Sequence, residues 1–486
     1  GSPMAELSAL RGMLATRTVS GEDGCALLMT AAEESDDPDR GVTYLADAVS
    51  DCFYAADGAA ARVLAARLET TLDRVTSSTS VALGRMALGI ARILAGIDGG
   101  REEVAAASRF LADDPAKVDE FLGRGPLAIG NPHRLCWLLL GPMFLRDVEV
   151  GQLRDVAGRL RDDAALGVLP SLLFQMARDQ ATSDRWSHAQ ATYTDAIRFA
   201  RESGETRDLV MSLSGLAWLD ARCGHDESSR ACVEQARTAD PTGRVLHARM
   251  WQMFAAGERD LVAGRAAEAA DHFGRLDARQ GEVDFLDVDM SPDPERVESL
   301  CRLERIDEAR EIASAYAARA AAKGQPWALA RSERALALTG PDDELDTHLE
   351  TALGLHAETL DGFETARTRL VVGERLRRAR RRKDAREQLR EAVAIFDQLG
   401  AAPWAERAAA ELAATGETAH RRHAGAAESL TPQELQVATL LTDGHTTREA
   451  ATALFLSPKT VEYHLRKAYL KLGVNSREAL ARALSE

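Results

Sequence analysis

Hydrophobic and polar residues recur at helical spacing over most of the chain. From Met4 to about residue 416, Ala, Leu, Arg and Glu are frequent, runs of β-branched residues are rare, and short Gly- and Asp-containing turns interrupt the pattern. Apolar positions three and four residues apart form one face of a helix and predict amphipathic helices that pack through that face. We therefore expect an all-α chain in which helix follows helix.

The helical region also contains a repeat. A pair of residues, often an acid followed by Ala, opens every second predicted helix at intervals of 40 residues, with one interval of 36. The pairs are His188-Ala189, Ser228-Ser229, Glu268-Ala269, Glu308-Ala309, Glu344-Leu345 and Asp384-Ala385. Small residues let paired helices approach closely while large ones fill the space between pairs, so this period predicts a tetratricopeptide-like superhelix. Before Trp186 the phasing fades, but Asp57-Gly58-Ala59 and Gly99-Gly100 still look like turns inside helical hairpins.

Three further helices are predicted near the C-terminus. Thr431-Pro432-Gln433-Glu434 and Thr446–Glu449 have the spacing of capping boxes, and Ser457-Pro458 opens a third helix. Gly444 and Gly473 stand where a left-handed residue ends a helix. Two short helices joined by a tight turn are typical of a helix-turn-helix unit.

The helix that begins at Pro458 is amphipathic, and its outer face is basic. The apolar stripe consists of Val461, Leu465, Ala468 and Leu472. The opposite face carries Lys459, Glu462, Tyr463 and Arg466, flanked by Thr460, His464, Lys467 and Lys471. Between residues 456 and 477 there are five Lys or Arg side chains and one Glu, whereas the whole chain has a net charge of −16. This local positive charge predicts that the helix enters the major groove of DNA.

Residues 430–484 resemble the C-terminal DNA-binding domain of LuxR-type (GerE-type) transcription regulators, most specifically in the run LSPKTVEYHLRKAYLKLGV. The resemblance implies base reading by Glu462, Tyr463 and Arg466. It implies DNA-backbone contacts by Thr447, Ser457, Lys459, Thr460, Lys467, Lys471 and Arg477, and we expect His464 on the same flank to join them. A fourth helix mediates dimerisation in that family, and Ala479, Leu480, Ala483 and Leu484 give it an apolar face suited to self-association.

The side-chain chemistry agrees with these assignments. Arg466 can form two hydrogen bonds with guanine, Glu462 can accept one from cytosine, and the Tyr463 ring can pack on a thymine methyl group. Lysines, hydroxyls and helix N-terminal amides hold phosphates without reading sequence. The alternative is a solvated helix face on a small domain with no ligand. The linked caps, turn and basic face favour DNA binding.

The repeats resemble the helical segment that precedes the LuxR-type domain in large ATP-binding regulators of the LuxR family, the group that includes the maltose regulator. The resemblance rests on GERLRRARR at 373–381 and GAAPWAERA at 400–408, and it implies that the repeats receive an inducer or an inhibitory partner. The chain lacks a G-x-x-x-x-G-K-[ST] loop, so we predict no cofactor, with ATP only if an upstream nucleotide-binding domain exists in the full-length protein. Gly1-Ser2-Pro3 looks like a tag remnant before Met4. Whether such a domain was removed or the regulator is naturally shorter stays open.

Composition narrows the class of protein. The 486 residues are 45% hydrophobic and 28% charged, which is typical of a soluble globular chain. No apolar run reaches membrane-spanning length and no signal peptide is visible, so we expect a cytoplasmic protein. The six cysteines lack paired spacing, and neither HExxH nor G-x-S-x-G occurs, so we predict neither a metal site nor an enzyme.

Three other features each allow two interpretations. The basic run Arg375, Arg377, Arg378, Arg380, Arg381, Arg382 and Lys383 is either a second nucleic-acid patch or a solvated turn within a repeat, and its acidic neighbours favour the turn. The residues Trp137, Trp186, Trp218, Trp251, Trp327 and Trp404 are spread about one per helical unit, which favours core anchors over a ligand cage. The stretch His420–His423 indicates a linker rather than a metal site.

We therefore predict an all-α regulator in four parts. Residues 1–3 are a tag remnant, 4–416 a tetratricopeptide-like sensor domain, 417–428 a linker, and 429–486 a four-helix LuxR-type domain. The expected function is transcription regulation, as an activator, with promoter DNA, a second copy of the chain, an inducer or protein partner, and RNA polymerase as partners, and no membrane. Two alternatives are a protein-interaction scaffold with an acidic concave surface, and the sensor and output portion of a signal-transduction ATPase.

Overall fold

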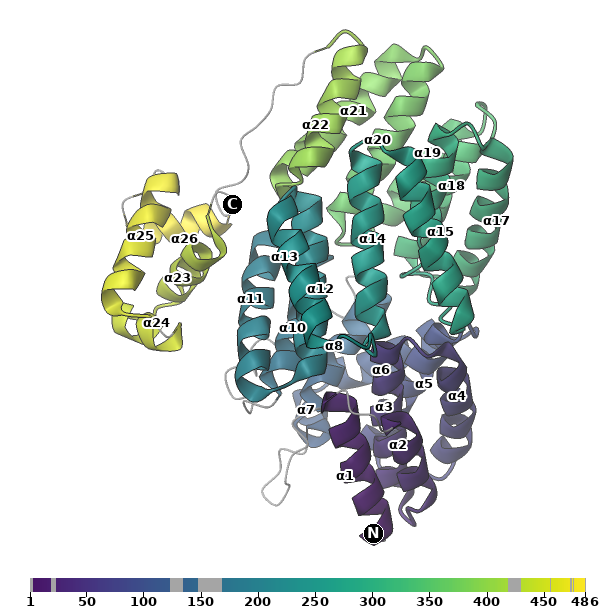
Figure 1. Cartoon of the computed structure of the whole chain (residues 1–486), viewed down its shortest axis with the longest axis vertical. Coiled ribbons are helices and arrows are strands. Elements are labelled where there is room, and N and C mark those ends of the chain that lie inside the picture. The colour runs from purple at the N-terminus through teal and green to yellow at the C-terminus, as the bar shows by residue number, and fades with distance from the viewer. Residues whose placement is uncertain are drawn as a thin grey trace.

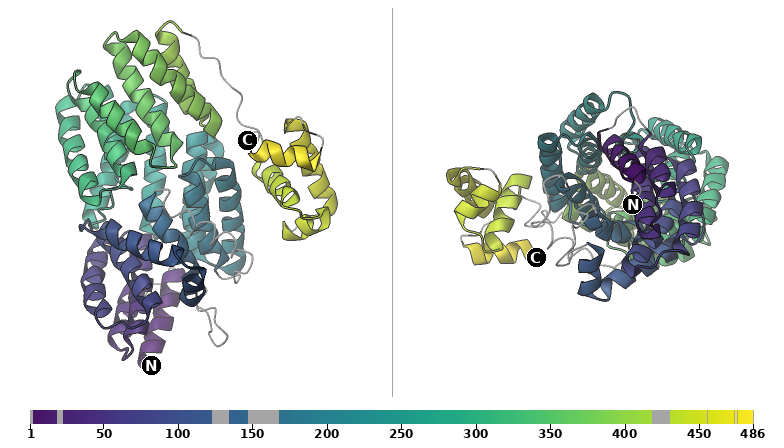
Figure 2. Two further views of the ribbon diagram at one scale, coloured as in Figure 1. Left: turned by 180° about the vertical axis from the view of Figure 1, so that it is seen from behind. Right: turned by 90° about the horizontal axis from the view of Figure 1, so that it is seen from below.

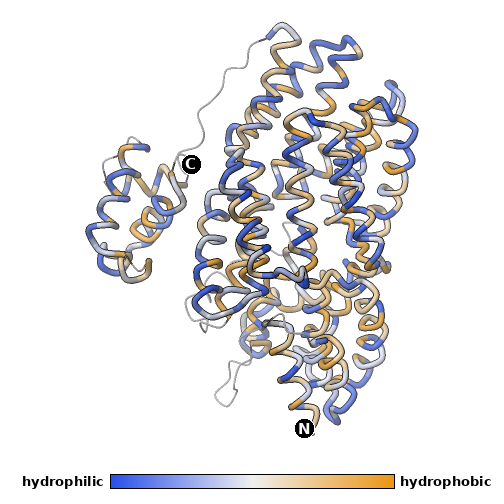
Figure 3. Tube along the Cα trace, in the orientation of Figure 1, coloured by the Kyte–Doolittle hydropathy of each residue, from blue (hydrophilic) through white to orange (hydrophobic). Residues whose placement is uncertain are grey.

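The computed structural model describes residues 3–18, 23–122, 134–146, 168–417, 430–454, 456–472, 474 and 476–485. All regular secondary structure in these ranges is helical, as the hydrophobic periodicity predicts. The helices form an elongated superhelix with a small domain beside it (Figure 1), and hydrophilic positions interrupt the hydrophobic ones along each helix (Figure 3). Within the described ranges, no helix is long and apolar enough to cross a membrane.

The N-terminal end of the superhelix consists of short helical hairpins. Asp57 caps α4 by accepting a hydrogen bond from the Ala60 amide, which confirms the predicted turn. At this turn the backbone of Gly58 approaches the loop after α15 so closely that a Cβ atom would lie 1.7 Å from the carbonyl oxygen of Asp284. The helices are α1 (Pro3–Thr18), α2 (Gly24–Glu33), α3 (Pro38–Ala55), α4 (Gly58–Leu72), α5 (Ser78–Leu94), α6 (Gly100–Ala112), α7 (Pro115–Phe121) and α8 (Arg134–Leu145).

The predicted repeat is confirmed from α10 onward. The six register pairs lie at the starts of α11, α13, α15, α17, α19 and α21. The second residue of each pair, Ala189, Ser229, Ala269, Ala309, Leu345 or Ala385, is at most 1% exposed, because it packs where two helices meet. The helices are α10 (Leu169–Ala181), α11 (Trp186–Ser203), α12 (Thr206–Cys223), α13 (Asp226–Ala239), α14 (Leu246–Val262), α15 (Ala266–Glu282), α16 (Asp293–Arg302), α17 (Ile306–Lys323), α18 (Pro326–Thr339), α19 (Leu345–His356), α20 (Gly362–Arg378), α21 (Arg382–Leu399) and α22 (Ala402–Ala414).

The even-numbered helices from α10 to α22 form the inner layer of the superhelix. Each contacts the next even-numbered helix, and the odd-numbered helices cover them from outside. The superhelix also closes on itself, because α22 contacts α12 and α14. At this closure Gly224, with φ of 83°, approaches Pro403 so closely that a Cβ would lie 2.8 Å from the proline ring. Seen from below, the helices surround a common axis (Figure 2).

The small domain contains α23 (Pro432–Thr442), α24 (Thr447–Ala453), α25 (Pro458–Leu472) and α26 (Arg477–Ser485). The four predicted helices are thus confirmed. Residues 418–428 of the predicted linker 417–428, the stretch His420–His423 within it, and residues 1–2 lie outside the described residues.

Candidate nucleic-acid interface and central cavity

Two capping boxes fix the starts of α23 and α24. Thr431 accepts a hydrogen bond from the Glu434 amide at 3.3 Å, and the Glu434 carboxylate accepts one from the Thr431 amide at 2.8 Å. Thr446 and Glu449 form the same reciprocal pair at 3.2 and 2.7 Å. Both boxes satisfy amides that the helix itself leaves unpaired. The predicted helix starts are therefore confirmed.

The tight turns on either side of α24 have local causes as well. Gly444 has a φ of 98°, a conformation that glycine adopts without strain, and it separates α23 from α24. Ser457 accepts a hydrogen bond from the Thr460 amide at 3.1 Å and begins α25. Gly473, the predicted end of α25, lies outside the described residues.

The apolar stripe of α25 anchors that helix to the rest of the domain. Val461 and Ala468 are fully buried, the first against α23 and α24 and the second against α23 and α26. Leu465 packs against both clusters. Because this stripe faces inward, the opposite face of α25 is fixed in an outward orientation.

The three predicted base-reading residues share this outward face. Glu462, Tyr463 and Arg466 are all exposed, and the Tyr463 side chain is 55% exposed despite its large ring. Lys467 lies over the Tyr463 ring with its Nζ atom 4.9 Å from the ring centre. The ring of His464 also contacts Tyr463, edge to face, with centroids 5.4 Å apart. These neighbours hold the tyrosine ring out toward solvent.

The predicted backbone-contacting residues surround this face, and several of them already form hydrogen bonds within the domain, as Arg477 does with the His445 carbonyl oxygen at 3.3 Å. Thr447, Ser457, Lys459, Thr460, His464, Lys467, Lys471 and Arg477 are each exposed or half-buried. Lys471, however, donates a hydrogen bond to Glu434 at 2.6 Å. Burial opposes ionisation of Glu434, but the hydrogen bonds from Lys471 and Thr431 prevail and lower the pKa of its carboxyl. Lys471 therefore ties α25 to α23, and its contact with a phosphate stays a prediction.

The fourth helix differs from the expected pairing surface at one position. Leu480 is 0% exposed and packs with Leu430, Leu435 and Ala468 in the domain core, because α26 turns this residue toward α23. It is unavailable for self-association, and replacing it with Arg would disrupt the core. Ala479, Ala483 and Leu484 remain half-buried, so pairing through α26 stays a prediction that depends on these three.

A contact joins the small domain to the superhelix. The Gln436 side-chain amide on α23 donates to the Asp195 carboxylate on α11 at 2.8 Å and to the Ala191 carbonyl at 3.4 Å. A groove between α10, α11, α23 and the end of α24 adjoins the contact. In Figure 1, α25 lies on the far side of the domain from the superhelix. The contact thus leaves the basic face open.

The basic run between α20 and α21 lies at a turn, as the acidic neighbours indicated. Arg375, Arg377 and Arg381 form ion pairs with Asp342, Glu411 and Asp346, respectively, each from a neighbouring helix or loop. The remaining basic residues, Arg378, Arg380, Arg382 and Lys383, are exposed.

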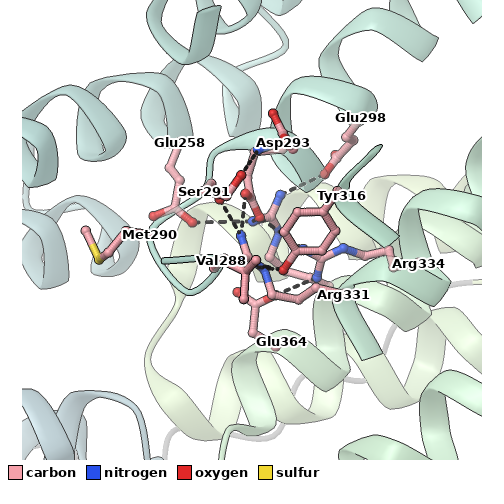
Figure 4. A network of polar contacts seen from close by, with 12 residues as sticks. Glu258, Val288, Met290, Ser291, Asp293, Glu298, Tyr316, Arg331, Arg334 and Glu364 are labelled. Carbon is pink, nitrogen blue, oxygen red and sulfur yellow. Dashed lines mark hydrogen bonds and ion pairs between the residues drawn. The ribbon is translucent and has the colours of Figure 1, made fainter. Parts of the chain in front are cut away.

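The inner layer contains a buried network of ion pairs that our sequence analysis missed (Figure 4). Glu295, which is 0% exposed, accepts hydrogen bonds from Arg331 at 2.6 Å, Arg334 at 3.0 Å and Arg367 at 2.8 Å. Arg334 also donates to Glu364 at 2.6 Å. Burial opposes ionisation of Glu364, yet Arg334 and the other guanidinium groups hold the pKa of its carboxyl well below its usual range.

One sequence signal points to this network. Arg331 and Arg334 on α18, like Glu364 and Arg367 on α20, are three residues apart and therefore share a helix face. Buried apolar residues lie beside them on that inner face, so the charges do not belong to a solvated side. Paired charges on the packing face of a helix can thus indicate a buried ion network.

Tryptophans and arginines line a cavity at the centre of the superhelix. Trp251 and Trp327 are at most 6% exposed, as core anchors would be, but together with Trp218 they also form walls of the cavity. Arg178 and Arg331 contribute guanidinium groups to the same walls. In the described ranges no group of three or more His, Cys, Asp or Glu side chains is arranged to hold a metal ion.

Comparison with known proteins assigns the small domain. Residues 428–484 match the bacterial regulatory proteins of the luxR family. Proteins named as HTH-type transcriptional regulators of Mycobacterium tuberculosis and Mycobacterium bovis are each 40% identical over 83 residues, which is 16% of this chain and 9% of each relative. The spore germination protein GerE of Bacillus subtilis is 48% identical over 48 residues, covering 10% of this chain and 65% of that protein. The match therefore spans less than a tenth of the mycobacterial relatives.

A solved structure titled as a Rap protein complexed with Competence and Sporulation Factor covers 78% of this chain and 98% of its own chain, at a TM-score of 0.46 and 14% identity. The assignment of the small domain rests on its caps, its basic face and the family match. The chain carries the DNA-binding helix-turn-helix domain of the luxR family of bacterial regulatory proteins, attached to a tetratricopeptide-like superhelix.

Proposed function

We propose that this chain is a transcription regulator that inserts α25 into the major groove of double-stranded DNA. The observation that carries the proposal is the outward face of α25, where Lys459, Arg466 and Lys467 are exposed in a chain of net charge −16. Concentrated positive charge binds phosphates and releases their counterions. Such a regulator acts in the cytoplasm, the location that the sequence predicts.

Base reading is assigned to three side chains. Arg466 donates two hydrogen bonds to guanine, Glu462 accepts from cytosine, and Tyr463 packs on a thymine methyl group. The exposed Lys459, together with the hydroxyls at the start of α25, holds the backbone and positions these three.

Fluorescence anisotropy with the full chain tests this function. A DNA site is first selected by the chain itself from random duplexes. Arg466→Ala should then weaken binding to the selected site by about 1–3 kcal/mol and binding to random DNA by less. Arg230→Ala, which removes an exposed arginine on α13, is the matched control and should change neither. Equal losses on both DNAs would assign Arg466 to a phosphate, and no binding to any duplex at low salt would refute the function.

We further propose that the superhelix senses a ligand or protein and controls DNA binding through the contact between α11 and α23. Asp195 holds Gln436 on one side and is itself held by Arg198 at 3.0 Å, so a shift of α11 would be transmitted to α23. Replacing both Asp195 and Gln436 with Ala should change DNA affinity several-fold, since a hydrogen bond of this kind contributes about 1 kcal/mol. Asp226→Ala, at an exposed position of α13, is the control. Unchanged affinity in the double variant would contradict this route.

Pairing on a two-fold site is the third part of the proposal. Two copies would meet through Ala479, Ala483 and Leu484 of α26, and an activator of this type would also contact RNA polymerase. Leu484→Glu should convert a two-step binding isotherm on a palindromic site into weaker binding by single copies. A variant that still binds as a dimer would exclude α26 as the pairing surface.

A further inference from the structure

The central cavity has the form of a small-molecule site. It lies between the inner helices α10, α12, α14, α18 and α20, and its volume is about 50 Å³. Trp218 and Trp251 stand beside each other on one wall with ring centroids 5.8 Å apart, and Trp327 contributes a second apolar wall. Apolar walls with a few charged and polar groups are typical of ligand sites.

Most charges around this cavity are already paired. Arg222 donates to Glu258 at 2.8 Å, and Arg331 to Glu295 at 2.6 Å. Arg146 lies 3.4 Å from Asp289, which also pairs with a lysine of α17. Each of these guanidinium groups is therefore already paired with a carboxylate of the protein.

Arg178 on α10 is the exception. It is 2% exposed, and among the described residues no carboxylate forms an ion pair with its guanidinium group. The charges of Asp287 and Asp289 act on it, but both of these carboxylates pair with Lys323 of α17. Its Nη1 atom is shielded from solvent and has no hydrogen-bond partner. Burial and the nearby Arg146 lower the pKa of Arg178 to about 10, which leaves the side chain charged at neutral pH. A buried charge without a partner is costly, because its lost hydration is not replaced.

Aromatic rings orient this guanidinium group without neutralising it. Phe53, Phe144 and Trp251 lie 5.2, 6.0 and 5.6 Å from its carbon atom, measured to the ring centres. Cation–π contacts of this kind stabilise the charge less than a charge-assisted hydrogen bond to an oxyanion does in the same surroundings. The group is held in place, faces the cavity and has no ion pair in the described part of the chain.

We propose that the cavity binds a small organic anion whose carboxylate or phosphate group pairs with Arg178 and whose flat apolar part lies against the tryptophans. The regulatory meaning of this site depends on the proposed function, but the binding itself does not. A link between the cavity and the domain contact is supported by the opposite side of α10, where Leu169 and Leu173 line the groove beside α23. An anion that draws Arg178 into the cavity would thus act on the helix that borders the domain contact.

Isothermal calorimetry with the full chain tests the site. The probes are benzoate, its neutral isostere benzamide, and inorganic phosphate alone. Benzoate should bind with one site per chain, and benzamide should bind about tenfold more weakly or not at all. Phosphate that competes with benzoate would assign the natural ligand to phosphate compounds, and benzoate binding without such competition would assign it to carboxylates. No binding of benzoate or phosphate at about 10 mM, or equal binding of benzamide, would overturn the proposal.

Arg178→Met separates a binding role from a structural one. This variant keeps the side-chain volume and removes an unpaired buried charge, so its melting midpoint without ligand should equal or exceed that of the parent, and benzoate binding should fall about tenfold or more. Arg237→Met, at an exposed site on α13, should change neither. A lower midpoint with benzoate affinity retained would show that Arg178 only supports the fold.

DNA binding by the same samples keeps the two proposals distinguishable. Benzoate should change the affinity of the parent for its selected DNA and leave that of Arg178→Met unchanged. Anion binding in a chain that binds no DNA would refute the regulatory function and leave the site intact. DNA binding with no anion binding would refute only the site.

Discussion

The inner-layer arginines of the superhelix and the basic residues on the outer face of α25 occupy opposite environments. Arg331, Arg334 and Arg367 are at most 1% exposed, and each is matched by glutamates of neighbouring inner helices. Arg466 and Lys459 in the small domain are exposed. The same charged groups therefore stabilise tertiary structure in one region and remain available to phosphates in the other.

The difference shows how burial decides the role of a charge. A buried guanidinium group needs a fixed carboxylate, because removing one partner leaves a charge that water cannot reach. An exposed one gains little from a protein partner, but it gains free energy from DNA through counterion release. Arg178 stands between these two classes, since it is buried like the first and unpaired like the second.

The largest expected effect comes from opening the buried network. Glu295→Gln removes the charge shared by Arg331, Arg334 and Arg367 and should lower the free energy of unfolding by about 3–5 kcal/mol. Urea denaturation of the variant, beside an exposed-site control, Glu268→Gln, measures this loss. A loss below about 1 kcal/mol would mean that the remaining glutamates compensate the three arginines.

A buried histidine should make the superhelix sensitive to acid. Burial, reinforced by Arg178, lowers the pKa of His247 to about 3, and its Nδ1 atom lies 2.9 Å from the Phe53 carbonyl oxygen. The folded-state pKa of His247 is below the unfolded value of 6.5. The stability that the neutral imidazole contributes is therefore complete above pH 6.5 and is lost as the pH falls toward 3. His247→Phe should remove about 1.4 kcal/mol per pH unit from the pH dependence of unfolding below pH 6. Identical slopes in variant and parent between pH 6 and 4 would contradict a neutral buried imidazole.

The exposed Lys459 of α25 should contribute to DNA binding through a salt-dependent phosphate contact and not through base reading. Lys459→Gln should reduce the slope of log affinity against log salt by about 0.9, the value for one lost phosphate contact. The change should be the same on selected and random DNA, and Arg230→Gln on α13 should leave the slope as it is. An unaltered slope in the Lys459 variant would remove this residue from the DNA interface.

The smallest expected effect concerns the basic turn of the superhelix. Replacing Arg378, Arg380 and Arg382 together with Gln should leave the salt slope of DNA binding unchanged, because these exposed residues belong to a solvated turn within a repeat. A slope reduced by two or three would instead identify this turn as a second phosphate-binding surface, at about one unit per contact.

Much of the fold was predictable because its signals are local. Capping boxes such as Thr431–Glu434, the left-handed Gly444 and the outward face of α25 depend on neighbours within one or two helical turns. The repeat register was equally accessible, since a residue such as Ala269 occupies the same packing position in every unit. Two predictions on the small domain missed tertiary contacts. Leu480, predicted at the pairing surface, lies in the core, and Lys471, predicted to contact the DNA backbone, pairs with Glu434.

The amino-acid sequence by itself determined the helices, their period and the basic surface of the last domain, because residues three and four apart share a helix face wherever that helix lies. Only the tertiary structure decided which charges meet. Arg367 reaches Glu295 across 72 positions of the chain, and Arg178 contacts three aromatic rings but forms no ion pair with any described residue. Such pairings depend on how the superhelix curves and closes, and that curvature is a sum of small rotations between repeats that no single stretch of sequence encodes.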